Sequence, residues 1–140
     1  MTAPGRERPV VAIDGPAGVG KSTAARRLAE RLGFTLVDTG ALYRAVALAA
    51  SERGVSWDDG PALTRVVGAV PIELTAGSAG GGVRIAGDDR SADIRAPHIS
   101  MGASAVSRHP EVRSALLDLQ RDLGREGGVV LEGRDIGTVV

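Results

Sequence analysis

Short continuous apolar runs and stretches with helical apolar spacing alternate along the N-terminal part of the chain. Val10–Ile13 is a β-branched run that stops before Gly15, as expected of a buried strand that ends in a loop. Between Lys21 and Leu32 the apolar residues recur at helical spacing instead, which predicts a helix. Both patterns then repeat, and this alternation of strand and helix predicts a parallel sheet. The expected strands are 10–13 and 34–37, and the expected helices are 21–32 and 41–53, with Gly33 and Gly54 as their C-terminal stops.

The middle of the chain follows another pattern. A helix is expected over Pro61–Val70, and two short strands over 70–74 and 83–86 flank the glycine-rich stretch 76–82. We interpret this region as a small inserted lobe with a loose hairpin, because apolar residues alternate on both sides of the glycines; a flexible linker is the competing interpretation. The other expected features are helices over 97–108 and 111–123 separated at Pro110, a buried strand over 129–131, a helix start at Asp58–Asp59 and a turn at Asp88–Asp89.

Composition and charge argue against several classes of protein. The chain has 140 residues, of which 43% are hydrophobic, and this suits one compact domain. Lys and Arg together number 17, as do Asp and Glu, and aromatic residues make up only 2%, so a nucleic-acid partner is not expected. No apolar run approaches the about 18 residues that a membrane span needs, and there is no cysteine. We therefore expect a cytoplasmic protein that binds neither membranes nor nucleic acid. A monomer is also expected.

One glycine-rich motif carries specific chemistry. Residues Gly15–Ser22 match G-x-x-x-x-G-K-[ST] and lie between an expected strand and an expected helix. Backbone N–H groups of such a loop bind phosphate oxygens, Lys21 can reach the β- and γ-phosphates, and the Ser22 hydroxyl can bind Mg²⁺. The motif therefore predicts a site for ATP or GTP with Mg²⁺, in preference to a tight turn without a ligand. The residues assigned to the nucleotide are Gly15, Pro16, Ala17, Gly18, Val19, Gly20, Lys21, Ser22 and Thr23, with Ser22 also assigned to the metal.

Polar residues follow the other two expected strands at their carboxyl ends, where ligands of open α/β sheets bind. Asp38 and Thr39 follow the second strand, and Arg44 lies on the next helix, where its guanidinium can bind a phosphate through paired hydrogen bonds. Arg134 and Asp135 follow the third strand. The arginine can neutralise an acceptor phosphate, and the carboxylate can accept a hydrogen bond from an amine such as cytosine N4. A solvated helix arginine and a local turn without a ligand are the alternatives at these two places.

The histidines and the tryptophan have weaker claims to function. Neither His98 nor His109 has further ligands at metal-binding spacing, so both are expected at surface or helix-boundary positions. Trp57 is expected in the core. None of the three is assigned a role in binding.

Together, these motifs resemble the bacterial cytidylate kinase family from about Val10 to Val140. The D-[ST]-G-A-x-Y-R and G-R-D-x-G-T-V-V runs are far more specific than the phosphate loop alone. The matching segments are the phosphate loop, Leu36–Arg44, Ile94-Arg95, the helical pair over 104–117 with Pro110–Arg113, and Leu131–Val140.

The resemblance implies an α/β fold, a P-loop nucleoside monophosphate kinase-like parallel sheet flanked by helices. Approximately residues 62–104 would form an inserted monophosphate-binding lobe. The implied reaction is the ATP- and Mg²⁺-dependent phosphorylation of CMP or dCMP to CDP or dCDP, with Lys21 and Arg134 as catalytic residues. The implied acceptor site has Arg44 and Arg134 at the phosphate, Thr39 near the ribose, and Ser104, Arg113 and Asp135 at the cytosine. Asp38 is also assigned to substrate binding, without a particular part of the nucleotide.

The sequence also departs from the family, which continues past G-R-D-x-G-T-V-V into a further strand, an arginine-bearing lid and terminal elements. Residues 1–140 are therefore expected to form a single P-loop kinase domain that is incomplete at its C-terminus. A nucleotide-binding fragment with impaired catalysis is one alternative, and a kinase for another small acceptor is a second. A GTPase-type switch ranks last, because the guanine-reading N-K-x-D sequence is absent.

Overall fold

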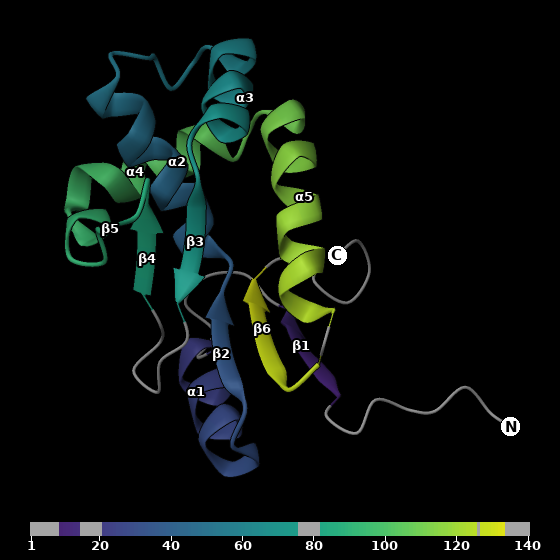
Figure 1. Cartoon of the computed structure of the whole chain (residues 1–140). Coiled ribbons are helices and arrows are strands. Elements are labelled where there is room, and N and C mark those ends of the chain that lie inside the picture. Colours follow the sequence, from purple (N-terminus) through teal and green to yellow (C-terminus); the bar gives the residue numbers. More distant parts are fainter. Residues whose placement is uncertain (1–8, 15–20, 76–81, 126, 134–140) are drawn as a thin grey trace, which may run out of the picture. The chain divides into compact units, whose positions relative to one another are not determined.

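A computed structural model of the chain describes residues 9–14, 21–75, 82–125 and 127–133 (Figure 1). These residues belong to two compact units. The first unit contains 9–14, 21–39, 119–125 and 127–133, and the second contains 40–75 and 82–118.

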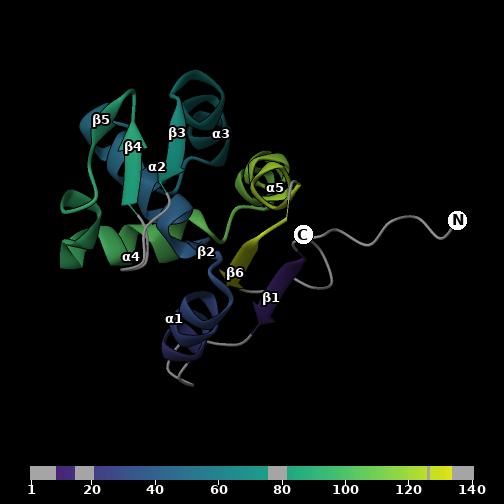
Figure 2. The ribbon, with the colours of Figure 1, turned by 60° about the horizontal axis from the view of Figure 1, so that its bottom comes forward.

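The first unit is built on a parallel sheet, as the alternation of strands and helices predicted. Its order is β1 (Val10–Asp14), β6 (Val129–Gly133) and β2 (Thr35–Asp38), and β6 pairs in parallel with both neighbours. Helix α1 (Lys21–Leu32) covers one face of this sheet (Figure 2). The core between helix and sheet consists of Ala25, Ala29, Leu36 and Val130, with Val11, Ile13, Leu28 and Phe34 packed against it.

The prediction that the first strand is buried was wrong for part of its length. Ala12 and Asp14 are exposed, and the other residues of β1 are half-buried, whereas Val129, Val130 and Leu131 of β6 are buried. The physical reason is that β1 is an outer strand of the described sheet, of which only Val11 and Ile13 pack against the core beneath α1, whereas Ala12 and Asp14 alternate with them on the opposite face. Apolar runs identify a strand, but they do not say whether it lies at the centre or at an edge.

The second unit is built around helix α2 (Gly40–Glu52), which lies against α4 and the strands β3 and β4. Its buried residues are Ala41, Leu42, Ala45, Val46, Ala47, Leu48, Ala49 and Ala50, and the six consecutive positions 45–50 lie on all sides of the helix axis. A helix that is apolar all round is suited to a central position, and its many alanines let neighbouring elements approach closely. The other elements are α3 (Gly60–Ala69), β3 (Ile72–Thr75), β4 (Gly82–Ile85), β5 (Asp88–Asp89), the 3-10 helix η1 (Asp93–Arg95), α4 (Pro97–Val106) and the part of α5 (Pro110–Gly124) up to Asp118, the rest of which belongs to the first unit.

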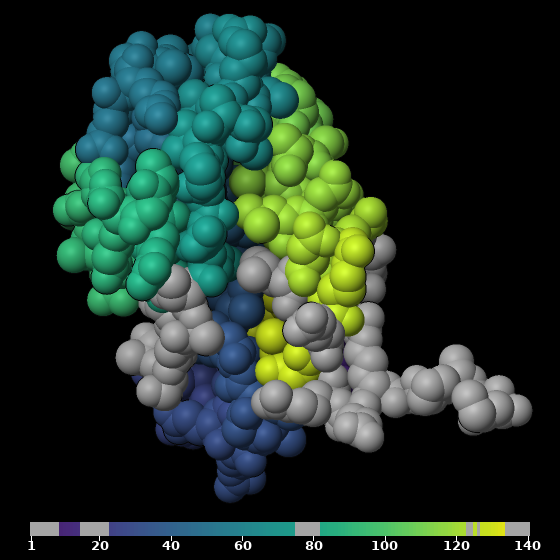
Figure 3. Space-filling view, viewed as in Figure 1, coloured from purple at the N-terminus to yellow at the C-terminus, as the bar shows by residue number. Residues whose placement is uncertain are grey.

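The predicted hairpin in the middle of the chain is confirmed, since β3 and β4 pair antiparallel. Together with α3 they form much of the teal and green surface in Figure 3. The predicted turn at Asp88–Asp89 was wrong: these residues form β5, which pairs with Arg84 and Ile85 of β4. The turn lies earlier, at Ala86 and Gly87, whose φ angles of 52° and 87° suit a tight two-residue hairpin. Ala-Gly is not a typical sequence for such a turn, so the turn at these two positions was not predicted.

Local capping signals located the helix ends correctly. Asp59 caps α3, as its Oδ1 accepts a hydrogen bond from the Ala62 N–H at 3.0 Å. Gly33 and Gly54 follow α1 and α2 with φ angles of 65° and 69°, as expected of C-terminal stops. Among the described residues, no helix combines the length and the apolar character that crossing a membrane requires.

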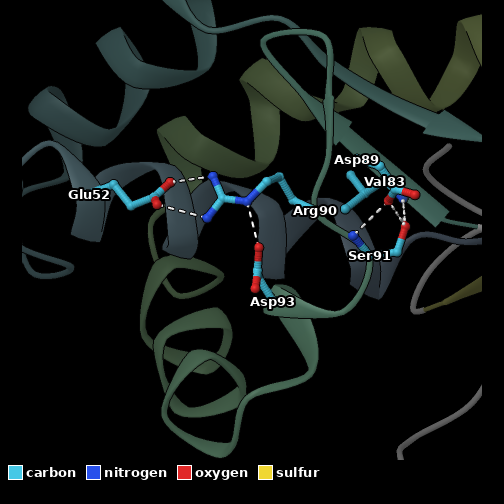
Figure 4. Close-up of polar contacts among 6 residues, drawn as sticks. All are labelled: Glu52, Val83, Asp89, Arg90, Ser91 and Asp93. Carbon is cyan, nitrogen blue, oxygen red and sulfur yellow. Dashed lines mark hydrogen bonds and ion pairs between the residues drawn. The ribbon is translucent and has the colours of Figure 1, made fainter.

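Arg90 ties the connection between β5 and η1 to the C-terminal end of α2. Its Nη1 and Nη2 donate to the two carboxylate oxygens of Glu52 at 2.8 and 2.7 Å, and its Nε donates to Asp93 Oδ2 at 2.6 Å (Figure 4). These hydrogen bonds lower the pKa of Glu52 and raise the pKa of Arg90. Beside this cluster, hydrogen bonds from the hydroxyl and the N–H of Ser91 lower the pKa of Asp89. One guanidinium therefore fastens a loop to a helix end.

Trp57, which was expected in the core, is half-buried, and Gly102 of α4 lies close to its indole. A Cβ at Gly102 would lie 2.5 Å from Trp57 Cζ2, so Gly102→Ala must displace the ring or the helix. We expect this substitution to reduce the free energy of unfolding by about 1–3 kcal/mol in urea denaturation. Gly68→Ala in α3 is the matched control. Nothing lies within 4 Å of the added Cβ there, and helix propensity predicts a gain of about 0.5–1 kcal/mol. Equal effects at the two glycines would contradict the packing of Trp57.

Glu52→Gln should reduce the free energy of unfolding at neutral pH by no more than about 1 kcal/mol, because the ion pair is partly exposed. Arg90 lowers the folded-state pKa of Glu52 below the ordinary 4.5. The stabilisation is therefore complete above that ordinary value and is lost as the pH falls through the folded-state pKa. Urea unfolding at a series of pH values should show the difference between wild type and variant shrinking in acid. The control Asp118→Asn removes another exposed carboxylate and should not reproduce this profile.

Candidate functional site

The register of the parallel sheet brings three strand ends to one edge of the first unit. Asp14 at the end of β1 is paired with Gly133 of β6, and Asp38 at the end of β2 is paired with Glu132. Because all three strands are parallel, each chain segment that follows them leaves the sheet at the same edge. These segments carry the motifs that the sequence singled out.

The phosphate-loop motif lies between a strand and a helix, as predicted. β1 ends at Asp14, and α1 begins at Lys21, with Ser22 and Thr23 in its first turn. The assigned residues Gly15, Pro16, Ala17, Gly18, Val19 and Gly20 lie outside the described residues, as do Arg134 and Asp135, which directly follow β6. A loop in this position can present backbone N–H groups and a helix N-terminus to phosphate oxygens.

Thr39 fastens the end of β2 to β6. Its side chain is buried, its N–H donates to the Glu132 carbonyl oxygen at 3.0 Å, and its hydroxyl donates to the same oxygen at 2.7 Å. The single proton of the hydroxyl is therefore used within the sheet, while the oxygen retains acceptor capacity. The position of Thr39 near a ribose stays a prediction, and any hydrogen bond to a sugar hydroxyl would have that hydroxyl as donor.

The second unit holds three further residues of the predicted acceptor site. Arg44 is half-buried on α2, and Ser104 and Arg113 are exposed on α4 and α5. Ser107 joins the last two, since its hydroxyl donates to the Ser104 carbonyl at 2.9 Å and its carbonyl accepts from Arg113 Nη1 at 3.2 Å. The structure thus brings Ser104 and Arg113 to one helix–helix turn. Asp38, half-buried at the end of β2, belongs to the first unit.

The donors offered for a metal are oxygens. The motif provides the Ser22 hydroxyl, and the described sheet edge provides carboxylates at Asp14 and Asp38. Oxygen donors suit Mg²⁺, which retains several waters and commonly binds one or two protein groups together with substrate phosphates. This donor set fits a Mg²⁺ ion that accompanies a bound nucleotide.

Two groups at the sheet edge were missed by the sequence reasoning. Asp14 is exposed, directly precedes the phosphate-loop motif in the sequence and is paired with Gly133, and the signal for it was available as a carboxylate at the end of an apolar run. The Glu132 carbonyl oxygen, which accepts both hydrogen bonds from Thr39, had no signal, because a backbone acceptor depends on strand pairing and not on residue type.

Comparisons with known proteins agree with these motifs. The sequence profile described as cytidylate kinase matches residues 11–140. The cytidylate kinase of Chromobacterium violaceum is 49% identical over 132 residues, which cover 94% of this chain and 58% of that protein. The cytidylate kinase of Pelotomaculum thermopropionicum is 50% identical over 133 residues, covering 94% and 59%. The bifunctional pantoate ligase/cytidylate kinase of Gloeobacter violaceus is 49% identical over 136 residues, covering 95% and 26%.

The chain thus spans less than two thirds of the length of the curated relatives it matches, but the matched part is nearly all of this chain. The matched region contains the phosphate loop, the strand ends that meet at one edge and the turn that carries Ser104 and Arg113. On this profile match and these identities, the chain belongs to the cytidylate kinase family.

Proposed function

We propose that this chain carries the ATP-binding loop and the acceptor-nucleotide residues of an ATP-dependent CMP/dCMP kinase. The observation that carries the proposal is the register that aligns Asp14, Gly133 and Asp38 at one sheet edge, with a motif typical of the family following each strand. The names of the relatives, which are cytidylate kinases, support a cytidine nucleotide as the acceptor. ATP is the proposed donor, and CDP or dCDP is the proposed product.

The proposed reaction depends on positioning and on positive charge around the transferred group, because phosphoryl transfer needs little covalent help from the protein. The backbone of Gly15–Gly20 binds the ATP phosphates, and Lys21 neutralises charge on the β- and γ-phosphates. Arg44 and Arg134 hold the acceptor phosphate, so that one of its oxygens attacks the γ-phosphorus in line as ADP leaves. Mg²⁺, with Ser22 as a protein ligand, would supply further charge neutralisation at the phosphates.

Base selection is assigned to Ser104, Arg113 and Asp135. A carboxylate accepts hydrogen bonds only, so Asp135 suits the N4 amine of cytosine and would face a carbonyl oxygen in uracil. A site built around one donor rejects the analogue that lacks it, because the buried acceptor is left unpaired. CMP and dCMP are therefore the proposed acceptors, and UMP is disfavoured.

The remaining expectations belong to the same proposal. Approximately residues 62–104 act as a monophosphate-binding lobe within one P-loop kinase domain. The protein acts as a cytoplasmic monomer on small nucleotides, without a nucleic-acid or membrane partner.

Asp135→Ala tests the proposed acceptor. Calorimetry with CMP, dCMP, UMP and AMP should show that the wild type binds CMP and dCMP at least about tenfold more tightly than UMP, the usual value of a hydrogen bond to a charged group. The variant should lose most of this preference. Asp58→Ala removes an exposed aspartate of the second unit and should leave it intact. Equal or absent binding of all four nucleotides by a folded wild type would overturn the proposed acceptor.

Lys21→Ala tests the donor site. We expect ATP affinity, measured with Mg²⁺ by calorimetry, to fall about tenfold or more, because charge-assisted hydrogen bonds to phosphate are lost. CMP affinity should not change. Arg27→Ala removes an exposed cation from the same helix and should preserve ATP binding. A similar loss from both variants would point to general charge attraction in place of a phosphate site.

A further inference from the structure

A chain of hydrogen bonds runs through the second unit from α2 to the start of α5. Trp57 Nε1 donates to the Ala47 carbonyl of α2 at 3.0 Å, and His109 Nε2 contacts the Trp57 carbonyl at 2.8 Å. A carbonyl oxygen accepts hydrogen bonds only, so His109 Nε2 carries the proton and donates. Two side chains with no assigned role therefore link segments that are far apart in the sequence.

His109 also caps α5 through its backbone. Its carbonyl oxygen accepts from the N–H groups of Val112 and Arg113, both at 3.1 Å. Arg113 in turn donates from Nη1 to the Ser107 carbonyl at 3.2 Å. The first turn of α5 and the guanidinium of Arg113 thus belong to one short turn, and the imidazole of His109 holds this turn to Trp57.

The other side of the imidazole and the indole ring are closely packed. His109 Nδ1 lies 3.8 Å from Glu111 Oε1, and a Cβ at Gly60 would overlap that oxygen and lie 2.9 Å from Nδ1. The indole leaves no room for a Cβ at Gly102, which lies two residues before Ser104 on α4. Both rings therefore lie close to the backbone of neighbouring elements.

The connected elements carry residues proposed to bind the acceptor. Ala47, which accepts from Trp57, lies one helical turn after Arg44 on α2. Ser104 is on the helix that packs against the indole, and Arg113 is on the turn that His109 caps. The two rings therefore contact the elements that carry the arginine proposed for the phosphate and the residues proposed for the base.

We propose that Trp57 and His109 are positioning residues for the acceptor nucleotide, which hold Ser104 and Arg113 in a fixed relation to Arg44. This inference rests on the proposed function, because it assigns a task to residues around the same acceptor site. Neither ring needs to touch the nucleotide. Their effect passes through Arg113 and leaves the ATP loop, which follows β1 in the first unit, unaffected.

The test compares His109→Asn with His109→Gln, which place a side-chain amide at different distances from the backbone. Gln can present its side-chain N–H₂ near the position of His Nε2, whereas the shorter Asn cannot reach it. We expect His109→Asn to raise the CMP dissociation constant about fivefold, the usual worth of one hydrogen bond, without changing that of ATP. His109→Gln should restore most of the CMP affinity. His98→Asn replaces the exposed histidine of α4 and is the matched control, with no change expected.

A double-substitution cycle separates positioning from general stability. If His109 acts through Arg113, adding His109→Asn to an Arg113→Ala background should produce no further loss of CMP affinity. Each protein is checked by circular dichroism and by the emission of Trp57, the one tryptophan of the chain. Should His109→Asn prevent folding, Trp57→Phe replaces it in the cycle, because it keeps an aromatic ring but removes the N–H that bonds to Ala47 along with part of the indole. Folding of that variant is checked by circular dichroism alone, since it contains no tryptophan.

The outcomes distinguish this inference from the proposed function. Unchanged CMP affinity, equal losses for CMP and ATP, or additive losses with Arg113→Ala would each overturn the positioning role alone. A folded wild type that fails to bind CMP would overturn the proposed function, and the positioning role with it. A selective and non-additive loss that Gln rescues would support both.

Discussion

The parallel pairing of β6 with β1 on one side and β2 on the other determines where the motifs of the first unit begin. β2 ends at Asp38 and β6 begins at Val129, so this pairing joins strands that are separated by the whole second unit along the chain. A slip of one residue would turn the buried Val130 to the other face and move Gly133 away from Asp14. Thr39 reinforces the register with its two hydrogen bonds to the Glu132 carbonyl.

The second unit depends on a central helix that is buried along most of its length. Helix α2 has few polar side chains with which to bind its neighbours, so its position is held by packing and by contacts at particular backbone and terminal groups. Trp57 uses the Ala47 carbonyl, and Arg90 uses the Glu52 carboxylate near the helix end. These contacts fix the helix that carries Arg44 without placing a charge in the core.

Polar groups in both units are used to hold segments together. Among the described residues, every buried side-chain nitrogen or oxygen has a hydrogen-bond partner. Unpaired buried polar groups are costly, so each such bond restricts the chain to the arrangement that provides it. Thr39 restricts the end of β2 in this way, and His109 restricts the start of α5. Residues proposed to bind nucleotides lie beside these fixed points.

Much of the fold and of the candidate site was predictable because it is encoded locally. Apolar spacing identified the helices and the main strands, Asp59 and the glycines Gly33 and Gly54 marked helix ends, and the phosphate loop was recognisable from eight consecutive residues. Lys21 could be assigned to phosphate binding on that motif alone. Each of these signals depends only on residues that are close to one another in the sequence.

The sequence by itself determined the elements and the motifs, and tertiary structure decided how they meet. The exposure of β1, the strand β5 after the Ala86 turn, and the Ala47–Trp57–His109 chain were not predictable. Each depends on strand order, on a turn without its usual residues, or on backbone carbonyls, which are the same in every residue type. These contacts form only when folding brings distant segments together, so they cannot be predicted from the types of the residues involved.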